Sequence, residues 1–205
     1  MTIIYNEYSK YLKEKFNCKV YKLPVNLPLT CPNRDGNLSS GGCTYCGEVG
    51  TGFEMHSCTM SVHDQLARNM SFIRQKYKAE KFIAYFQNFS NTYLAFDEFK
   101  RYIQEAVMDD IVGMSISTRP DCLNEDYVTF LAEIKREHDL DMTVELGLQT
   151  ANYKTLRKIN RGHSLAEFID AVLMLKRLDL SVCAHVILNL PWDTMEDAVE
   201  TSKVL

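Results

Sequence analysis

The 205-residue sequence predicts an α/β fold in which helices wrap a parallel sheet. Three observations support this prediction. Strand-like and helix-like segments alternate along the chain. The strand-like segments are short and apolar on both faces, as in parallel sheets that helices cover. Polar clusters follow these segments, where parallel α/β folds gather their ligand sites.

Each element follows from a local pattern, beginning with a strand at residues 20–29, an apolar run interrupted by two prolines. A long loop leads to Ser61, which is a helix N-cap signal because acidic Asp64 stands three residues later. The helix is expected to end near Tyr77, since its apolar residues keep helical spacing until then. A second strand is expected at residues 81–87.

The middle of the chain repeats this order of helix and strand. Asp97 starts a helix whose aromatic and aliphatic residues recur at helical spacing, and the third strand is expected at residues 111–117. Asn124 caps a helix that runs to about Glu137. The fourth strand is expected at residues 142–148.

The last third begins with a capping box, in which Ser164 and Glu167 open an amphipathic helix. A fifth strand is expected at residues 180–190, and a further helix begins at Thr194. The sequence stops at Leu205 within that helix, so we expect a C-terminal part with a sixth strand to be missing.

The composition predicts one soluble domain. A chain of this length with 46% apolar residues can bury one core, so we expect one domain over residues 1–205, with residues 1–19 as an N-terminal helical extension. No apolar run approaches the ~20 residues that span a bilayer. Seven cysteines is an odd number and no signal peptide is recognisable, which argues against disulfides and for the reducing cytoplasm.

The net charge of −4 gives no overall attraction for nucleic acid, although a local basic face is compatible with it. Positive charge concentrates before and within the cysteine-containing segment. This cluster is either a solvated surface or an RNA-facing one. Its members are Lys10, Lys13, Lys15, Lys19, Lys22 and Arg34.

Three cysteines, Cys31, Cys43 and Cys46, follow the first strand with the spacing C-x11-C-x2-C. A four-iron four-sulfur cluster normally takes four thiolates, so three would leave one iron open for chemistry. Structural zinc is the alternative, with Cys58 as a fourth ligand. The cysteines outside the triplet, namely Cys18, Cys58, Cys122 and Cys183, are otherwise expected to be buried.

Four further polar clusters stand at the ends of the expected strands. Because parallel strands end at one edge of a sheet, these clusters are expected to share one rim with the cysteines. They are residues 87–92, 117–121, 149–150 and 189–191.

These features, over about residues 20–195, resemble the radical S-adenosylmethionine (SAM) superfamily. The segment C-P-N-R-D-G through G-G-C-T-Y-C is similar to the YhcC-type branch, whose first two cysteines are widely spaced. The wide spacing, S-T-R-P-D at 117–121 and N-R-G-H at 160–163 also resemble the catalytic subunit of elongator, which modifies wobble uridines in tRNA.

The resemblance implies a partial (β/α)6 TIM-like barrel, truncated near its fifth strand-helix unit. It also implies a 4Fe-4S cluster on Cys31, Cys43 and Cys46, SAM as second cofactor, and reductive cleavage of SAM to a 5′-deoxyadenosyl radical. A reducing partner such as flavodoxin or ferredoxin would supply the electron, and tRNA would be the substrate of a transferase. The resemblance favours this iron-sulfur cluster over the structural zinc site.

The same resemblance implies which side chains contact SAM, while no catalytic residue is assigned. The chain departs from the family's pattern where polar residues replace glycines after the second strand. After the fifth strand, Asn189 and Trp192 replace two further glycines, and Asp193 stands where the family has a glutamate. The implied contacts are Tyr45, Gln87, Ser90, Asn91, Ser117, Arg119, Glu145, Gln149, Arg161, Ile187 and Leu190.

Three polar residues have structural alternatives. Glu145 lies inside the fourth strand, where an unpaired carboxylate would be costly, so it either faces the site or pairs with a basic neighbour. A loop role is expected for His163, and His185 is expected to be a core histidine.

Three functions therefore remain open. The first is radical modification of tRNA. The second is the same chemistry on a small metabolite, which the negative total charge favours. The third is a zinc-stabilised binding module without catalysis.

Overall fold

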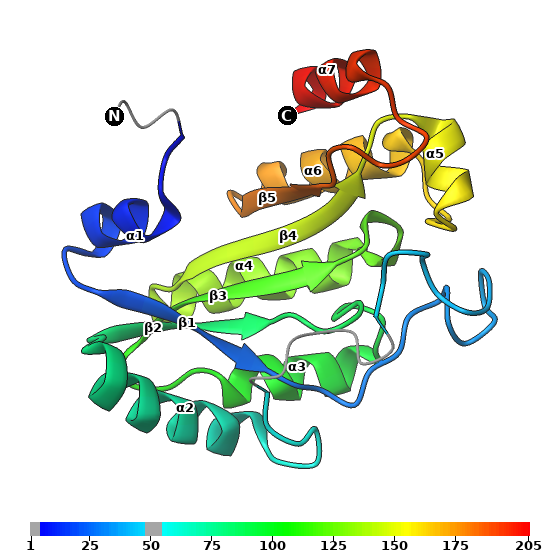
Figure 1. The fold of residues 1–205 in the computed structure, drawn as a ribbon. Helices are drawn as coiled ribbons and strands as arrows, with labels where there is room; N and C mark the ends of the chain where they lie inside the picture. The colour runs from blue at the N-terminus through cyan, green and yellow to red at the C-terminus, as the bar shows by residue number, and fades with distance from the viewer. Residues whose placement is uncertain (1–4, 48–54) are drawn as a thin grey trace.

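The computed structural model describes residues 5–47 and 55–205 and contains one five-stranded parallel sheet (Figure 1). The strand order β1-β2-β3-β4-β5 follows the sequence, so each strand pairs with the next one along the chain. This confirms the predicted α/β fold with parallel strands. The strands are β1 (Val20–Val25), β2 (Lys81–Phe86), β3 (Ile111–Thr118), β4 (Asp141–Gln149) and β5 (Ser181–Val186).

The helices lie between the strands, as the alternating pattern predicts. They are α1 (Tyr8–Phe16), α2 (Val62–Tyr77), α3 (Phe96–Glu105), α4 (Glu125–His138), α5 (Tyr153–Lys158), α6 (Leu165–Arg177) and α7 (Met195–Val204), with a 3₁₀ turn η1 (Pro120–Cys122). The caps at Ser61, Asn124 and Ser164 form as expected, the last as a complete capping box. No helix of the described residues is long and apolar enough to cross a membrane.

Two strands end earlier than the sequence patterns predict, and one helix was not expected. The chain turns after β1, where Leu29 N donates to Leu27 O at 2.8 Å. After β5 it turns at Asn189, whose φ is 63°. Helix α5 has only six residues and depends on its N-cap, Asn152, whose side chain accepts from two backbone N–H groups.

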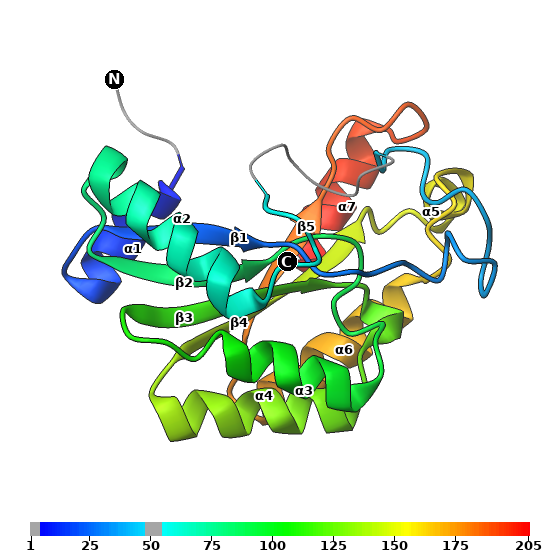
Figure 2. The same cartoon turned by 90° about the horizontal axis from the view of Figure 1, so that it is seen from below.

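The sheet has one apolar and one polar face, which corrects the expectation that its strands are apolar on both. Along β3, Met114 and Ile116 are buried in the main core, whereas Ser117 faces the other way and lines a cavity. On β4, Val144 is likewise buried in the main core, whereas Glu145 faces the other way and lines the cavity. The apolar face packs against helices, of which α3, α4 and α6 lie beneath the sheet in Figure 2.

Helix α1 covers the amino-terminal end of the polar face. Its Leu12 is buried in a small cluster with Val20 of β1 and Ile83 of β2. Lys15 Nζ lies 2.6 Å from Asp141 Oδ1 at the start of β4. The carboxyl end of the polar face therefore remains available for a site.

Candidate functional site

One cavity lies at the carboxyl ends of the strands, on the polar face of the sheet. The three predicted cysteine ligands line it, together with most of the residues expected to contact SAM. The residues that it brings together from the prediction are Cys31, Cys43, Tyr45, Cys46, Gln87, Ser117, Arg119, Glu145, Gln149 and Arg161. Arg34, Phe89, Tyr85 and His185 line the same cavity.

The eleven residues between Cys31 and Cys43 fold back on themselves. Asp35 and Ser40 form an isolated antiparallel bridge, and Gly36 N donates to Ser39 O at 3.1 Å. Leu38 N reaches back to Pro32 O at 2.8 Å. This return brings Cys43 to the cavity that Cys31 lines, which explains how so wide a spacing forms one site.

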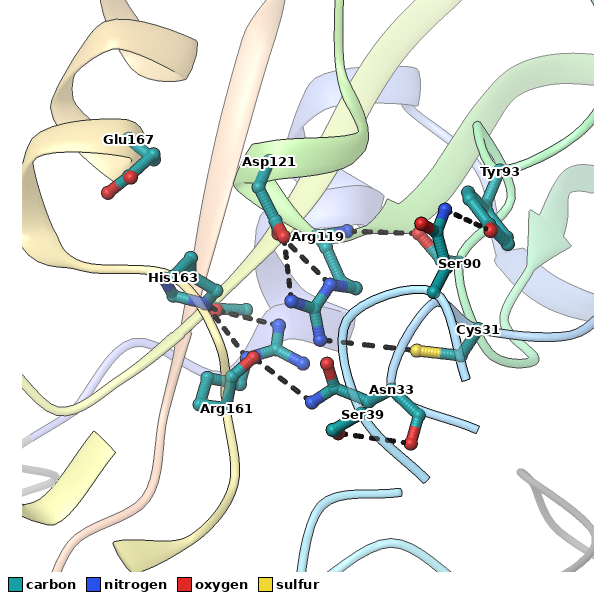
Figure 3. Close-up of polar contacts among 12 residues, drawn as sticks. Cys31, Asn33, Ser39, Ser90, Tyr93, Arg119, Asp121, Arg161, His163 and Glu167 are labelled. Atoms are coloured by element: carbon teal, nitrogen blue, oxygen red, sulfur yellow. Dashed lines mark hydrogen bonds and ion pairs between the residues drawn. The ribbon is translucent and has the colours of Figure 1, made fainter. Parts of the chain in front are cut away.

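Asn33 fastens this loop to the segment that follows α5. Its side chain is fully buried, and its Nδ2 donates to Asn160 O and to Arg161 O, the latter at 3.1 Å (Figure 3). The same nitrogen lies 3.4 Å from Cys43 Sγ. In the other direction, Asn160 Nδ2 donates to Gly42 O at 2.8 Å. Two segments over 100 positions apart thus hold Cys43 between them.

A buried guanidinium approaches Cys31. Arg119 is 1% exposed, and its Nε and Nη2 donate to the two carboxylate oxygens of Asp121 at 3.0 and 2.7 Å, a bidentate pair. Burial lowers the pKa of Arg119, but its hydrogen bonds to the Asp121 carboxylate outweigh this and raise it. Its Nη1 lies 4.0 Å from Cys31 Sγ (Figure 3). A fixed positive charge therefore faces the first thiol.

A second buried guanidinium approaches Cys43. Arg161 Nη1 lies 3.8 Å from Cys43 Sγ, and Nη2 donates to Gly147 O at 2.9 Å. Arg161 Nε donates to His163 Nε2 at 2.8 Å, so His163 is neutral with its proton on Nδ1, 3.2 Å from Ser164 O. Burial, and then the charge of Arg161, lower the pKa of His163 to about 4. His163 positions Arg161, consistent with its expected loop role.

Gly147 makes room for this arrangement. A Cβ added at Gly147 would clash with Arg161 Nη2 and stand 2.6 Å from Gln149 Nε2. Gln149 itself has a positive φ of 72° at the end of β4. The positions of Gln149 and Arg161, both predicted SAM contacts, therefore require a glycine at position 147.

Glu145 is both paired and part of the site. It is 3% exposed and accepts from Lys22 Nζ at 2.5 Å, Tyr85 Oη at 3.0 Å and Ser117 Oγ at 3.2 Å. His185 Nε2 lies 2.9 Å from Glu145 Oε2, the oxygen that also accepts from Tyr85 and Ser117. Burial raises the pKa of Glu145, but the bonds from His185 and Lys22 outweigh this and lower it to about 2. The carboxylate is therefore ionised within the cavity wall.

Two expectations about single residues are wrong. His185 is not a core histidine, because its side chain is 45% exposed in the cavity wall. The four cysteines outside the triplet are not buried: Cys183 is exposed, and Cys18, Cys58 and Cys122 are half-buried. Cys183 and His185 belong to β5, an edge strand of the sheet.

Four predicted SAM contacts do not line the cavity. Asn91 is buried, and its Nδ2 donates to the backbone oxygens of Phe86, Asn88 and Ser117. Ser90 is buried beside Thr118, with their hydroxyl oxygens 3.0 Å apart. These bonds anchor the loop after β2 to the end of β3. Ile187 and Leu190 instead pack against Leu156 and Ile159 in a small separate core.

One lining residue carried a sequence signal that was not used. Tyr85 stands two positions before Gln87, so a period of two would have placed it on the same face as that predicted contact. Phe89 had no such signal, since it lies in a loop. Its ring sits 5.1 Å from the Arg34 guanidinium.

Three cysteine thiols on one cavity suit an iron-sulfur cluster, whose irons are held by thiolates. Within residues 5–47 and 55–205, no three His, Cys, Asp or Glu side chains gather where they could hold a single metal ion. Zinc needs four ligands at about 2.0–2.3 Å from one point, whereas a cluster distributes its thiolates over several irons. The guanidinium N–H groups beside Cys31 and Cys43 would also offset the negative charge of bound thiolates.

Comparison with known proteins places the chain in a family. It is 37% identical over 202 residues to YtqA of Bacillus subtilis and 34% identical over 197 residues to YhcC of Escherichia coli, covering 98% and 96% of the chain. It spans 62% of the length of each relative.

Two further similarities are more distant. A stretch of 104 residues, 50% of the chain and 21% of the relative, is 31% identical to a tRNA uridine(34) acetyltransferase of Dehalococcoides mccartyi. The fold matches archaeal Elp3 of Methanocaldococcus infernus with a TM-score of 0.61 and 18% identity, over 90% of this chain and 41% of that one.

The model of the Radical SAM superfamily matches residues 31–205, which begin at the first cysteine of the triplet. This family uses a 4Fe-4S cluster and SAM, the two cofactors that the sequence resemblance implies. The chain belongs to the Radical SAM superfamily.

Proposed function

We propose that this chain holds a 4Fe-4S cluster on Cys31, Cys43 and Cys46 and cleaves SAM reductively, for the modification of a wobble uridine in tRNA. The observation that carries the proposal is the convergence of these three cysteines on one cavity lined by two buried arginines. When bound, such a cluster with one open iron supplies the electron that converts SAM to methionine and a 5′-deoxyadenosyl radical.

The residues of this chain bind, orient and shield. Arg119 and Arg161 direct N–H groups toward Cys31 and Cys43, so they stabilise the charge of the thiolates. The planar fork of Arg161 suits the methionine carboxylate, with Gln149 beside it. Tyr45, 40% exposed at the cavity, offers a ring surface for adenine.

The tRNA substrate rests on similarity and on the basic residues near the amino terminus. The sequence similarity to a tRNA uridine(34) acetyltransferase covers half of the chain. Of the basic residues, Lys15 and Lys22 are paired with Asp141 and Glu145, and Lys10, which is 67% exposed, lies 4.0 Å from Glu14. Because Lys15 and Lys22 are paired, the basic surface is smaller than the sequence cluster suggests. This and the net charge of −4 favour a small metabolite as the second candidate substrate.

The cofactor part is tested by anaerobic purification and reconstitution. We expect a brown protein with about four irons, which forms 5′-deoxyadenosine from SAM and a strong reductant. A colourless protein that contains zinc and no iron would instead identify a binding module.

The substrate part is tested by mass spectrometry of tRNA nucleosides from a strain that lacks the gene. We expect one modified wobble uridine to disappear and its unmodified precursor to accumulate. An unchanged nucleoside profile would reject tRNA as substrate and leave SAM cleavage standing.

A further inference from the structure

Three charged residues, Lys22, Glu145 and His185, meet at the wall of the cysteine cavity, which Glu145 and His185 line. Glu145 is 3% exposed at its side chain, while the side chains of Lys22 and His185 are 25% and 45% exposed. The carboxylate therefore lies behind and the two cations lie in front of it. Solvent and ligands meet mainly the positive part of this cluster.

The cluster stands where two cavities adjoin. Tyr85 and Gln87 line both the cysteine cavity and a neighbouring one between α1 and β1. His185 lines the first and Lys22 the second. A group bound between the two cations would thus face the open space on both sides.

The positions of both cations are fixed by their surroundings. Lys22 Nζ is held 2.5 Å from Glu145 Oε1, and it lies 4.4 Å from the ring centre of Tyr85 and 5.1 Å from that of Tyr8. One of its three N–H groups serves Glu145, so the other two can serve a ligand. The bonds of His185 with Cys183 and Glu145 raise its pKa to about 9, which keeps the ring charged at neutral pH.

The charges do not cancel. With Lys22 and His185 positive and Glu145 negative, the cluster carries a net charge of about +1 at neutral pH. Glu145 already accepts from four donors, so it has little capacity left to bind a ligand itself. Its role is to hold the two cations in place.

We propose that Lys22, which donates its remaining N–H groups, and His185, which contributes its positive charge, form an anion-binding subsite, which takes a phosphate or carboxylate group of the substrate. This inference rests on the proposed function, because it treats the cysteine cavity as the place where substrate meets SAM. It adds a specific pair of substrate-binding residues and assigns α1 a share in the site through Tyr8.

The subsite can be tested by binding alone, on the reconstituted protein with SAM under anaerobic conditions. Inorganic phosphate and acetate are titrated while the labelled imidazole signal of His185 is followed by NMR and assigned with His185→Gln. We expect saturable shifts. Tighter binding of phosphate would indicate a phosphorylated substrate such as RNA, and tighter binding of acetate a carboxylate metabolite.

Variants of Lys22 supply the decisive comparison. Lys22→Gln is expected to weaken binding of the preferred anion about tenfold, the equivalent of one charge-assisted hydrogen bond, while Lys22→Arg keeps it. The matched control is Lys203→Gln, because Lys203 also lies 2.5 Å from a glutamate oxygen but outside the cavity. It should bind like the wild type.

Two results would overturn the subsite: shifts that rise only linearly with both anions, or unchanged affinity in Lys22→Gln. If that variant does not fold, His185→Gln gives the same information through the phosphorus signal of phosphate, with the same tenfold loss expected. Formation of 5′-deoxyadenosine is measured separately in each preparation. Loss of anion binding and failure of SAM cleavage are therefore distinguishable.

Discussion

Arg161 contacts both the carboxyl end of β4 and the cysteine loop. Its Nη1 lies 3.8 Å from Cys43 Sγ, while its Nη2 donates to Gly147 O at 2.9 Å. One side chain thus contacts a proposed cluster ligand and the strand end where SAM is expected. Its Nε is held by neutral His163. The position of Arg161 therefore affects both proposed cofactors.

Gly147→Ala should displace Arg161, because the added Cβ would clash with Arg161 Nη2. We expect SAM to bind about tenfold more weakly, the equivalent of one lost charge-assisted hydrogen bond, as measured by equilibrium dialysis on the reconstituted protein. Gly47→Ala is the control, since a Cβ there meets nothing within 4 Å. Equal SAM affinity in both variants would show that Arg161 does not bind SAM.

Asn33→Ala should loosen the cysteine loop. It removes the donor to Asn160 O and Arg161 O and leaves buried carbonyls unpaired, which costs about 1–3 kcal/mol of unfolding free energy. We expect that loss in urea denaturation, together with a lower iron content after reconstitution.

Asn37→Ala is its matched control on the same loop. Asn37 is exposed and donates to Tyr93 Oη at 2.9 Å, away from the cysteines. Its stability and iron content should stay near those of the wild type. If both variants lost iron equally, the hydrogen bonds from Asn33 to Asn160 O and Arg161 O would have no special role in holding the cysteine loop.

The ion pair of His185 and Glu145 predicts a stability that depends on pH. The pKa of His185 is raised from 6.5 to about 9, so the pair contributes fully below pH 6.5 and its contribution is lost as the pH rises through 9. Because His185 is half-exposed, we expect a loss of only about 1 kcal/mol, measured by urea unfolding between these pH values.

His185→Gln should remove this part of the pH dependence. The control is His63→Gln, since His63 lies 3.5 Å from Asp64 but is 61% exposed and far from Glu145 in sequence. The account would be wrong if wild type and His185→Gln lost the same stability between pH 6.5 and 9.

The fold and the gathering of the three cysteines at one edge of the sheet could be predicted because their signals are local. Alternating apolar segments and the caps at Ser61, Asn124 and Ser164 define helices within a few residues of their ends. The cysteines follow a strand, so the rules for parallel sheets place them at the correct edge.

Contacts between distant segments could not be predicted in the same way. Lys22 and Glu145 are 123 positions apart, and nothing local to Lys22 distinguishes it from the other lysines of the basic cluster. Their pairing depends on how the whole sheet places β1 and β4, which are separated by β2 and β3. Ile187 and Leu190 were expected at SAM, but the unpredicted helix α5 supplies the apolar surface that they cover.

The central claim is that Cys31, Cys43 and Cys46 hold the cluster at which SAM is cleaved. The most direct test measures iron and 5′-deoxyadenosine together in Cys43→Ala and in Cys58→Ala, both reconstituted anaerobically. The account predicts that Cys43→Ala loses 5′-deoxyadenosine formation to background and binds less iron, while Cys58→Ala keeps both. Full iron and full 5′-deoxyadenosine in Cys43→Ala, or their loss in Cys58→Ala alone, would contradict it.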